Sequence, residues 1–295
     1  MADVLQKGSL FDPQLVSELI SKVKGKSSLA KLSNQTPIPF NGMKEFTFTL
    51  DSDVDIVAEN GKKSHGGVSI DPVIIRPIKI EYGARITDEF MYAQDDVKLN
   101  ILKAFTDGFS TKVARALDLM AFHGVNPRTK EKSTVIGDNY FDNIVTQQVT
   151  FDKAQIEENI ETAVSMVQSS NGVVNAMAMA PTFSMELAKL KVNGVRQYPE
   201  LSWGATPSSV NGLNVDVNST VSEGKDVKDK AILGDFSNMF KWGYAKEIPV
   251  EIIQYGDPDN SNKDLKGYNQ VYLRAEAYIG WGIMDKDSFV KIVEG

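Results

Sequence analysis

The sequence predicts an α+β protein, on three observations from different parts of the chain. Residues 45–50 (EFTFTL) alternate apolar and polar side chains, which is the period of a half-buried strand. Residues 96–122 repeat apolar side chains every three or four positions, which is the period of an amphipathic helix. Residues 150–217 alternate helical and strand patterns, which is typical of an α/β module.

Composition excludes several classes of function. The 295 residues, 42% of them hydrophobic, are enough for a sizeable core in one large domain or two interleaved ones. Because the chain has no cysteine, thiol catalysis, disulfides and cysteine-ligated zinc are ruled out. A net charge of -7 argues against avid nonspecific binding to duplex DNA by the isolated chain. The sequence contains no signal-peptide pattern and no apolar run of ~20 residues, so we expect cytoplasmic synthesis and no membrane partner.

The first 33 residues predict a short helix on a locally basic segment. Asp12 is a favourable N-cap followed by Pro13 at the first helical position, and Gly25 ends the apolar stripe. A helix of this length is unstable alone, so it needs a surface to lie on. The basic side chains of this segment include Lys22, Lys24, Lys26 and Lys31.

Residues 45–50 and 73–80 predict a long two-stranded arm. Both segments alternate in polarity, and residues 58–67 (AENGKKSHGG) form a polar, glycine-rich tip between them. Pro72 and Pro77 suit an edge strand better than the centre of a sheet. Because an isolated two-stranded ribbon is marginally stable at best, we expect this arm to rest on a neighbouring subunit.

A long helix is predicted over residues 96–122, with Asp95 or Asp96 as its N-cap. At ~1.5 Å per residue this helix would be roughly 40 Å long. Gly124 and Pro127 end it. The apolar stripe that we expect to be buried comprises Leu102, Phe105, Phe109, Val113, Leu117 and Met120.

The longest predicted strand covers residues 269–284, near the end of the chain. Its first half alternates in polarity, and from Ala277 it is almost wholly apolar, which predicts one solvated face and then burial on both faces. Gly280 and Gly282 indicate a close approach of another backbone or an aromatic surface. The other predicted elements are a helix from 150 or 152 to 171, a helix over 182–191, and strands at 173–180, 215–217, 231–236, 240–244 and 249–254.

Patterns typical of catalysis or ligand binding fail their tests. The two histidines, His65 and His123, lack metal-site spacing and are interpreted as surface or turn residues. Residues 24–27 (KGKS) lack the first glycine of a phosphate-binding loop. Residues 51–55 and 257–261 fail as calcium loops and are interpreted as solvated turns. We therefore expect no enzyme, cofactor or metal, and a cytosolic α/β enzyme is the weaker alternative.

Taken in order, these segments resemble the tailed-bacteriophage major capsid proteins from end to end. The first part of the resemblance lies in FDPQLVSELISKVKGKSSLAKL (11–32) and VDIVAENG (54–61). RITDEFMYAQDD (85–96) then leads into the long helix, and AFHGVNP (121–127) closes it. LGDFSNMFKWGY (233–244) precedes the terminal strand. The collinear order of these short motifs over nearly the whole chain carries the resemblance.

The resemblance implies the capsid fold, with an N-terminal arm, a two-stranded extended loop, a long spine helix in a peripheral domain, and an α/β axial domain. It also implies a structural protein that assembles as hexamers and pentamers into an icosahedral head shell around double-stranded DNA. Separate scaffolding and portal proteins, assembly in the bacterial host cytoplasm and location in the virion follow from the same resemblance. An encapsulin-like compartment shell around an enzyme cargo is the alternative. The implied divisions are 1–40 for the arm, 41–86 for the loop, 87–149 with 245–284 for the peripheral domain, and 150–244 with 285–295 for the axial domain.

The resemblance also suggests residue roles. In some capsid families a lysine of the extended loop forms an isopeptide bond with an asparagine of another subunit, assisted by a glutamate. Lys62 or Lys63, Asn269 and Glu276 match these by position. Most relatives do not cross-link, and a separation of seven residues places the last two side chains on opposite faces of a strand, so we expect a noncovalent shell. The candidates for facing packaged DNA, without sequence specificity, are Lys22, Lys24, Lys26 and Lys31.

Overall fold

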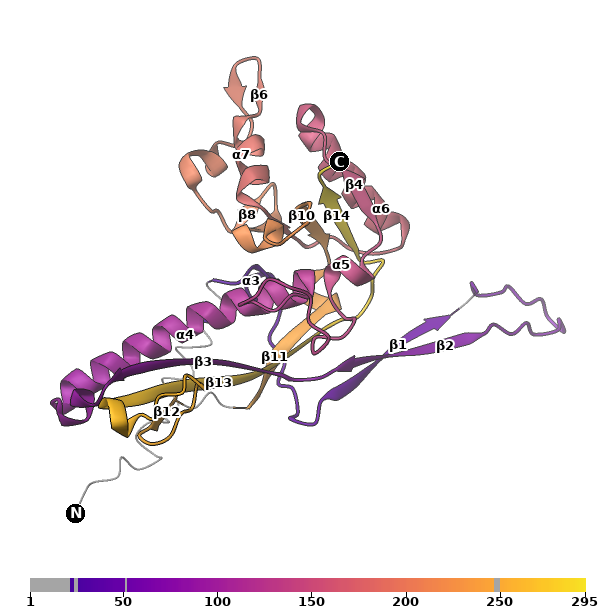
Figure 1. The fold of residues 1–295 in the computed structure, drawn as a ribbon. Coiled ribbons are helices and arrows are strands. Elements are labelled where there is room, and N and C mark those ends of the chain that lie inside the picture. The colour runs from indigo at the N-terminus through magenta and orange to yellow at the C-terminus, as the bar shows by residue number, and fades with distance from the viewer. Residues whose placement is uncertain (1–21, 24–25, 51, 247–249) are drawn as a thin grey trace.

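The computed structural model describes residues 22–23, 26–50, 52–246 and 250–295, which build two sheets, a long helix and a projecting ribbon (Figure 1). The helix expected from Asp12–Pro13 lies almost wholly outside these residues. The long helix runs alongside one sheet and ends beneath the other (Figure 1). None of the helices within the described residues has the length and apolar content needed to cross a bilayer.

The first sheet is organised around β13 (Gln270–Ile283), the longest strand. β3 (Ile78–Thr87) pairs antiparallel along one side of it. On the other side β12 (Val250–Ile253) pairs with its first half and β11 (Phe240–Lys246) with its second half. Burial alternates along β13 up to Tyr278 and is continuous from there to the end of the strand, as the sequence predicts.

The long helix is α4 (Asp95–His123), which confirms the predicted helix. Gln94 holds the N-cap position without a side-chain hydrogen bond, so the predicted cap at Asp95 or Asp96 is wrong. Both carboxylates instead lie in the first turn, where the helix dipole favours negative charge. Gly124 ends the helix in the left-handed conformation, with a φ of 66°. Of the six residues expected to be buried, Leu102 and Phe105 are only partly buried. The other four, Phe109, Val113, Leu117 and Met120, are buried.

The second sheet has six strands, and helices cover both of its faces. Met177, Leu233 and Val290 pack beneath α6 (Ile156–Ser169) and α7 (Pro181–Lys189). The opposite face packs on the C-terminal half of α4 and on three short helices, α3 (Ser28–Leu32), α5 (Phe141–Ile144) and α8 (Phe236–Met239). The strand order is β4 (Gln148–Thr150), β14 (Phe289–Val293), β10 (Asp229–Gly234), β5 (Ala176–Met179), β9 (Leu213–Val217) and β8 (Ser209–Val210).

An aromatic cluster joins the two sheets. Phe141 lies at its centre, with ring centroids 5.0 to 5.9 Å from four other phenylalanines. All of these rings are buried, and aromatic side chains bury more apolar area than most others. The cluster therefore makes the two sheets one packed body. The four partners are Phe122, Phe236, Phe240 and Phe289.

The ribbon consists of β1 (Met43–Leu50) and β2 (Val68–Ile75), paired antiparallel over their whole length. The predicted returning strand at 73–80 is wrong as a single element. Pro77, which lacks a backbone N–H, lies between β2 and β3, and residues from Ile78 onward pair with β13 instead. The remaining short elements are η1 (Asp88–Tyr92), η2 (Lys153–Gln155), β6 (Lys191–Val192), β7 (Val195–Arg196), η3 (Pro199–Gly204), η4 (Ser219–Ser222) and η5 (Lys266–Tyr268).

Candidate functional site

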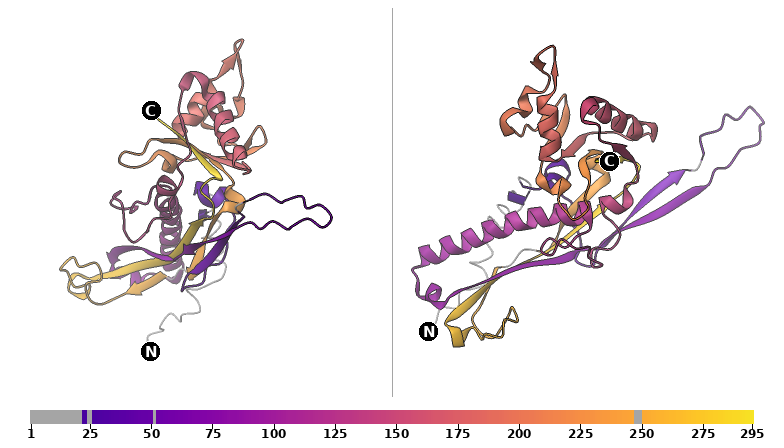
Figure 2. Two further views of the ribbon diagram at one scale, coloured as in Figure 1. Left: turned by 90° about the vertical axis from the view of Figure 1, so that its right-hand side faces the viewer. Right: turned by 45° about the horizontal axis from the view of Figure 1, so that its top comes forward.

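One face of the ribbon is apolar and uncovered. Antiparallel pairing places the even-numbered residues of both strands on the same side, so Phe46, Ile70 and their neighbours form one continuous surface. Their exposed fractions range from 42% to 64%, and Figure 2 shows the ribbon projecting away from both sheets. A contiguous apolar surface of this kind marks an interaction site. The exposed apolar residues of this face are Phe46, Leu50, Val68, Ile70 and Ile74.

The base of the ribbon is fixed to the first sheet. Ile75 is fully buried against β13, where a Cβ on Gly282 would lie 2.8 Å from its Cγ1. A close approach therefore occurs at this glycine, but the approaching atoms belong to an aliphatic side chain and not to the backbone or aromatic surface that was predicted. The Thr47 hydroxyl donates a hydrogen bond of 3.1 Å to the Met284 carbonyl oxygen. The ribbon is therefore anchored at one end and uncovered along the rest of its length.

A second candidate site is a set of buried charges where α4 meets the second sheet. The Asp118 carboxylate accepts hydrogen bonds from the backbone amides of Ser28 (3.0 Å) and Leu29 (3.2 Å). It also accepts from the hydroxyls of Thr220 (2.7 Å) and of Ser27, the N-cap of α3. Burial raises the pKa of Asp118 to about 6, although these hydrogen bonds oppose the rise. One carboxylate thus holds α3, α4 and η4 together.

His123, the last residue of α4, is buried, so its interpretation as a surface or turn residue is wrong. Its Nδ1 lies 2.8 Å from an Asp142 carboxylate oxygen, and its Nε2 lies 2.8 Å from the Thr220 carbonyl oxygen. Both oxygens can only accept, so the ring satisfies both when both nitrogens are protonated. Burial alone would lower the pKa of His123, but the bonds to Asp142 and Thr220 raise it.

Lys291 of β14 completes this charge network. Its ammonium nitrogen lies 3.2 Å from one Asp142 oxygen and 3.8 Å from Asp229 Oδ1. Burial and the neighbouring Asp142 raise the pKa of Asp229 to about 7. Ligand atoms of His123, Asp142 and Asp229 lie within 4.8 Å of one another, but both imidazole nitrogens are engaged and an ammonium lies among the carboxylates. The arrangement is therefore a balanced charge network rather than a metal centre.

We call these five residues, Asp118, His123, Asp142, Asp229 and Lys291, the buried joint. They come from α4, α5, β10 and β14. Thr220 links the two halves, since its hydroxyl binds Asp118 and its carbonyl binds His123. The joint thus fixes the end of the long helix to the second sheet.

Comparison with known proteins identifies the family. The model of the phage capsid family matches residues 7–293. This chain belongs to the phage capsid family. A structure from Mycobacterium phage Ogopogo is 30% identical, covers 92% of each chain and has a TM-score of 0.77. None of the curated proteins matches the chain.

More distant phage and GTA structures share the fold. One from Gordonia phage Cozz is 22% identical, covering 91% of this chain and 87% of that chain, with a TM-score of 0.74. The capsid of a native GTA particle, computed with C5 symmetry, is 14% identical over 100% of this chain and 99% of that chain, with a TM-score of 0.62. The predicted family and fold are confirmed, and the chain is a structural capsid protein.

The lysines expected to face DNA in a capsid are partly engaged within the chain. Lys31 pairs with Asp216 at 2.7 Å, and Lys22 pairs with Asp107. Lys26 is exposed. Lys24 lies outside the described residues. The structure therefore leaves one of the three described lysines without an ion pair inside the described chain.

The proposed cross-linking residues are not brought together within one capsid subunit. Lys62 and Lys63 are exposed at the tip of the ribbon, together with His65. Asn269, with a φ of 52°, directly precedes β13, at the other end of the molecule from the tip (Figure 1). Glu276 is held by ion pairs to Lys79 at 2.7 Å and Arg274 at 3.5 Å. Any such bond would need a lysine from a second copy.

The predicted solvated turn at 257–261 is held by a basic residue. The Arg85 guanidinium lies 2.7 Å from an Asp257 oxygen and 2.5 Å from an Asp259 oxygen. Hydrogen bonding to Asp259, followed by the charges of both carboxylates, raises the pKa of Arg85. The two carboxylates that would begin a calcium loop therefore already have a cationic partner.

Proposed function

We propose that copies of this chain assemble as pentamers and hexamers into an icosahedral head shell that encloses double-stranded DNA. The observation that carries this proposal is the uncovered apolar face of the ribbon. Fully burying one large aliphatic or aromatic side chain contributes about 1.5–3 kcal/mol. Burying the five exposed apolar residues of this face on a neighbouring copy would therefore contribute several kcal/mol per subunit.

The symmetry of the related particles supports ring formation. The GTA capsid structures that share this fold were computed with C5 symmetry. A ring requires each subunit to contact the next through two different surfaces, which then close around an axis. A ribbon fixed at its base and extended away from the body suits such a contact, because it reaches past the edge of its own subunit (Figure 2).

Further partners follow from the proposed role as a head shell. Lys26 and Lys24 are the remaining candidates for neutralising packaged DNA, through sequence-independent contacts with phosphate. Separate scaffolding and portal proteins would act during assembly in the host cytoplasm. The structures named above come from phages and a GTA particle, which favours a head shell over an encapsulin-like compartment.

The proposal is tested by electron microscopy and sedimentation velocity of the purified full-length chain. We expect rings or closed shells, whose formation depends on protein concentration. A stable, compact monomer across a wide range of salt and protein concentration would contradict the proposal. Nuclease treatment of particles from infected or induced cells would show whether the enclosed material is DNA.

A further inference from the structure

Trp203, in the second sheet's domain, is almost completely exposed. Its exposed fraction is 98%, whereas Trp242 and Trp281, the other tryptophans of the chain, are buried. Trp203 also has a φ of 62°, a left-handed conformation that a residue other than glycine, asparagine or aspartate adopts rarely. Folding of a single subunit therefore gains nothing from this large apolar side chain.

The loop that carries Trp203 is nevertheless well anchored. Leu201 is buried in the core beneath α7, and the Ser202 hydroxyl accepts a 2.8 Å hydrogen bond from Arg196 of the β6–β7 hairpin. Ala205 N–H donates to the Ser202 carbonyl oxygen at 3.2 Å. The residues on both sides are thus held in place while the indole points outward. A rigidly presented, exposed tryptophan is typical of an interface hot spot.

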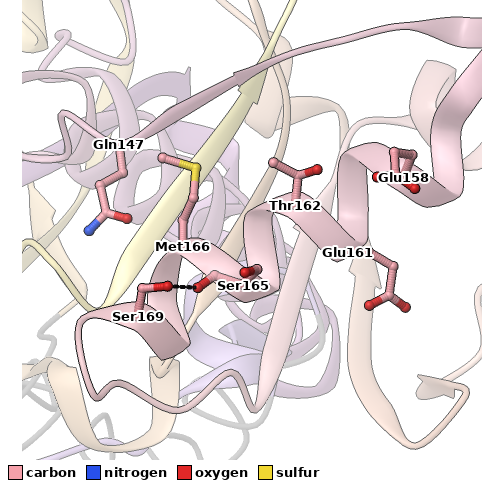
Figure 3. A pocket seen from close by; sticks show the side chains of 7 residues that line it. All are labelled: Gln147, Glu158, Glu161, Thr162, Ser165, Met166 and Ser169. Carbon is pink, nitrogen blue, oxygen red and sulfur yellow. Dashed lines mark hydrogen bonds between the residues drawn. The ribbon is translucent and has the colours of Figure 1, made fainter.

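A hollow with complementary chemistry lies at the other edge of the same sheet. It is a shallow depression of about 600 Å³, largely open to solvent, and lies against α6 beside β4 (Figure 3). Short side chains, among them Ser165, leave room on the helix, and the thioether of Met166 offers a favourable contact to an aromatic ring. Glu158 and Glu161 have no ion-pair partner among the described residues and could accept the indole N–H.

The positions of the two surfaces preclude their meeting within one subunit. Trp203 precedes β8, which is one edge strand of the six-stranded sheet, and the hollow adjoins β4, which is the other. A ring joins neighbouring copies through two different surfaces of the chain, and the β8 and β4 edges are two such surfaces on opposite sides of one sheet. Charge also matches, because the hairpin that adjoins the Trp203 loop carries Lys191 and Arg196, and the hollow is acidic.

We infer that Trp203 of one copy inserts into the α6 hollow of the adjacent copy within each ring. The occupant of the hollow is thus a second copy of this chain. This inference rests on the proposed assembly into rings and adds the pair of surfaces that closes them. It adds a contact between the six-stranded sheets of neighbouring copies to the contact that the ribbon makes, and ring formation needs both.

Tryptophan fluorescence of the full-length protein tests the burial of Trp203. Emission should shift to shorter wavelength when subunits assemble, because the only exposed indole becomes buried. Trp203→Phe should remove that shift, and Trp203→Ala should raise the concentration needed for rings by about tenfold or more. Assembly with unshifted emission would overturn this inference and leave the proposed function intact. Failure of the wild-type chain to assemble would overturn both.

Engineered disulfides test the partner surface. Because the chain has no cysteine, no native thiol can form a competing disulfide. Ala205→Cys combined with Ser165→Cys should give a ladder of covalent oligomers after oxidation of assembled protein. The matched control combines Ala205→Cys with Gln168→Cys, which is exposed on α6 but does not line the hollow. A ladder from the pair with Ser165→Cys, and none from the pair with Gln168→Cys, supports the inference. No ladder, or equal ladders from both pairs, would overturn it.

Discussion

The ribbon and the buried joint differ in what surrounds their side chains. In the joint, Asp118 and His123 find hydrogen-bond partners in segments about a hundred residues away, all within one subunit. In the ribbon, Phe46 and Ile70 are exposed, and no described part of the same chain covers them. These partners of the joint are thus all present in a single copy, whereas the apolar face of the ribbon is uncovered there. Substitutions in the two regions should therefore separate folding from assembly.

We expect the largest difference in unfolding free energy between a variant of a core phenylalanine and a variant of a ribbon phenylalanine. Truncating a buried Phe to Ala typically costs ~3–5 kcal/mol. Phe109→Ala should lower the free energy of unfolding by about that amount, a large part of a domain's ~5–15 kcal/mol. Phe46→Ala should change subunit stability by less than about 1 kcal/mol, because its side chain is exposed. Denaturant unfolding of both variants checks this, and equal losses would contradict it.

The next effect concerns the hydrogen bonds of the joint. Asp118→Ala leaves the amides of Ser28 and Leu29 and the hydroxyl of Thr220 without their acceptor. An unsatisfied buried donor costs about 1–3 kcal/mol, so the variant should unfold at clearly lower denaturant concentration. It should also expose α3 to limited proteolysis. Asp71→Ala, on the exposed ribbon, is the matched control and should leave both measurements unchanged.

The joint should also make stability depend on pH. A group whose pKa is raised in the folded state stabilises below its unfolded pKa and loses that contribution as pH rises through the folded pKa. His123 and Asp229 (about 7) are such groups, as is Asp118 (about 6). The pKa of Asp142 is lowered, so its contribution is lost only in stronger acid. The melting temperature should therefore fall as pH rises from about 4 to about 7, and the raised pKa of His123 extends the fall above that side chain's usual pKa of 6.5.

His123→Gln sharpens this prediction. The glutamine cannot become charged, so the fall in melting temperature across that pH range should be smaller than in the wild-type chain. Part of it should remain, because Asp118 and Asp229 still titrate with raised pKa values. A melting temperature that rises from about pH 4 to pH 7 in the wild-type chain would contradict the raised pKa values of Asp118 and Asp229.

We expect no covalent bond between subunits, so substitution of the cross-link candidates should have the smallest effect. Particles boiled in denaturant should give a single monomer band, because Glu276 is engaged by Lys79 and Arg274 rather than free to act as a base. The double variant Lys62→Ala, Lys63→Ala should run identically. A ladder of covalent oligomers that disappears in this variant or in Glu276→Gln would contradict a shell held by noncovalent contacts.

Much of the fold could be predicted because its elements have strong periodic patterns. The long helix at 95–123 and the long strand at 270–283 each show many repeats of one period. The prediction of a single strand at 73–80 was wrong, because alternation of polarity does not show where a segment changes the strand with which it pairs. Proline at position 77 was the available signal, since it marks the break between the ribbon and the first sheet.

The buried joint could not be predicted, because its partners come from distant parts of the chain. Periodicity identifies a buried face but not which polar group on it is satisfied. A signal was nevertheless present, since Asp118 is the only charged residue in the apolar run 116–122 (ALDLMAF). Lys291 likewise interrupts the apolar run FVKIV at 289–293, which is β14 and was not predicted as a strand. A lone charge in such a run indicates a buried ion pair.

The proposed assembly depends on the apolar face of the ribbon. Ile70→Lys places a charge on this face, and Ser69→Lys places the same charge on the opposite face, one residue away. Sedimentation velocity of both variants beside the wild-type chain is the most direct test. We expect Ile70→Lys to remain a folded monomer and Ser69→Lys to form rings or shells. Normal assembly of Ile70→Lys, or equal loss of assembly in both, would contradict the account.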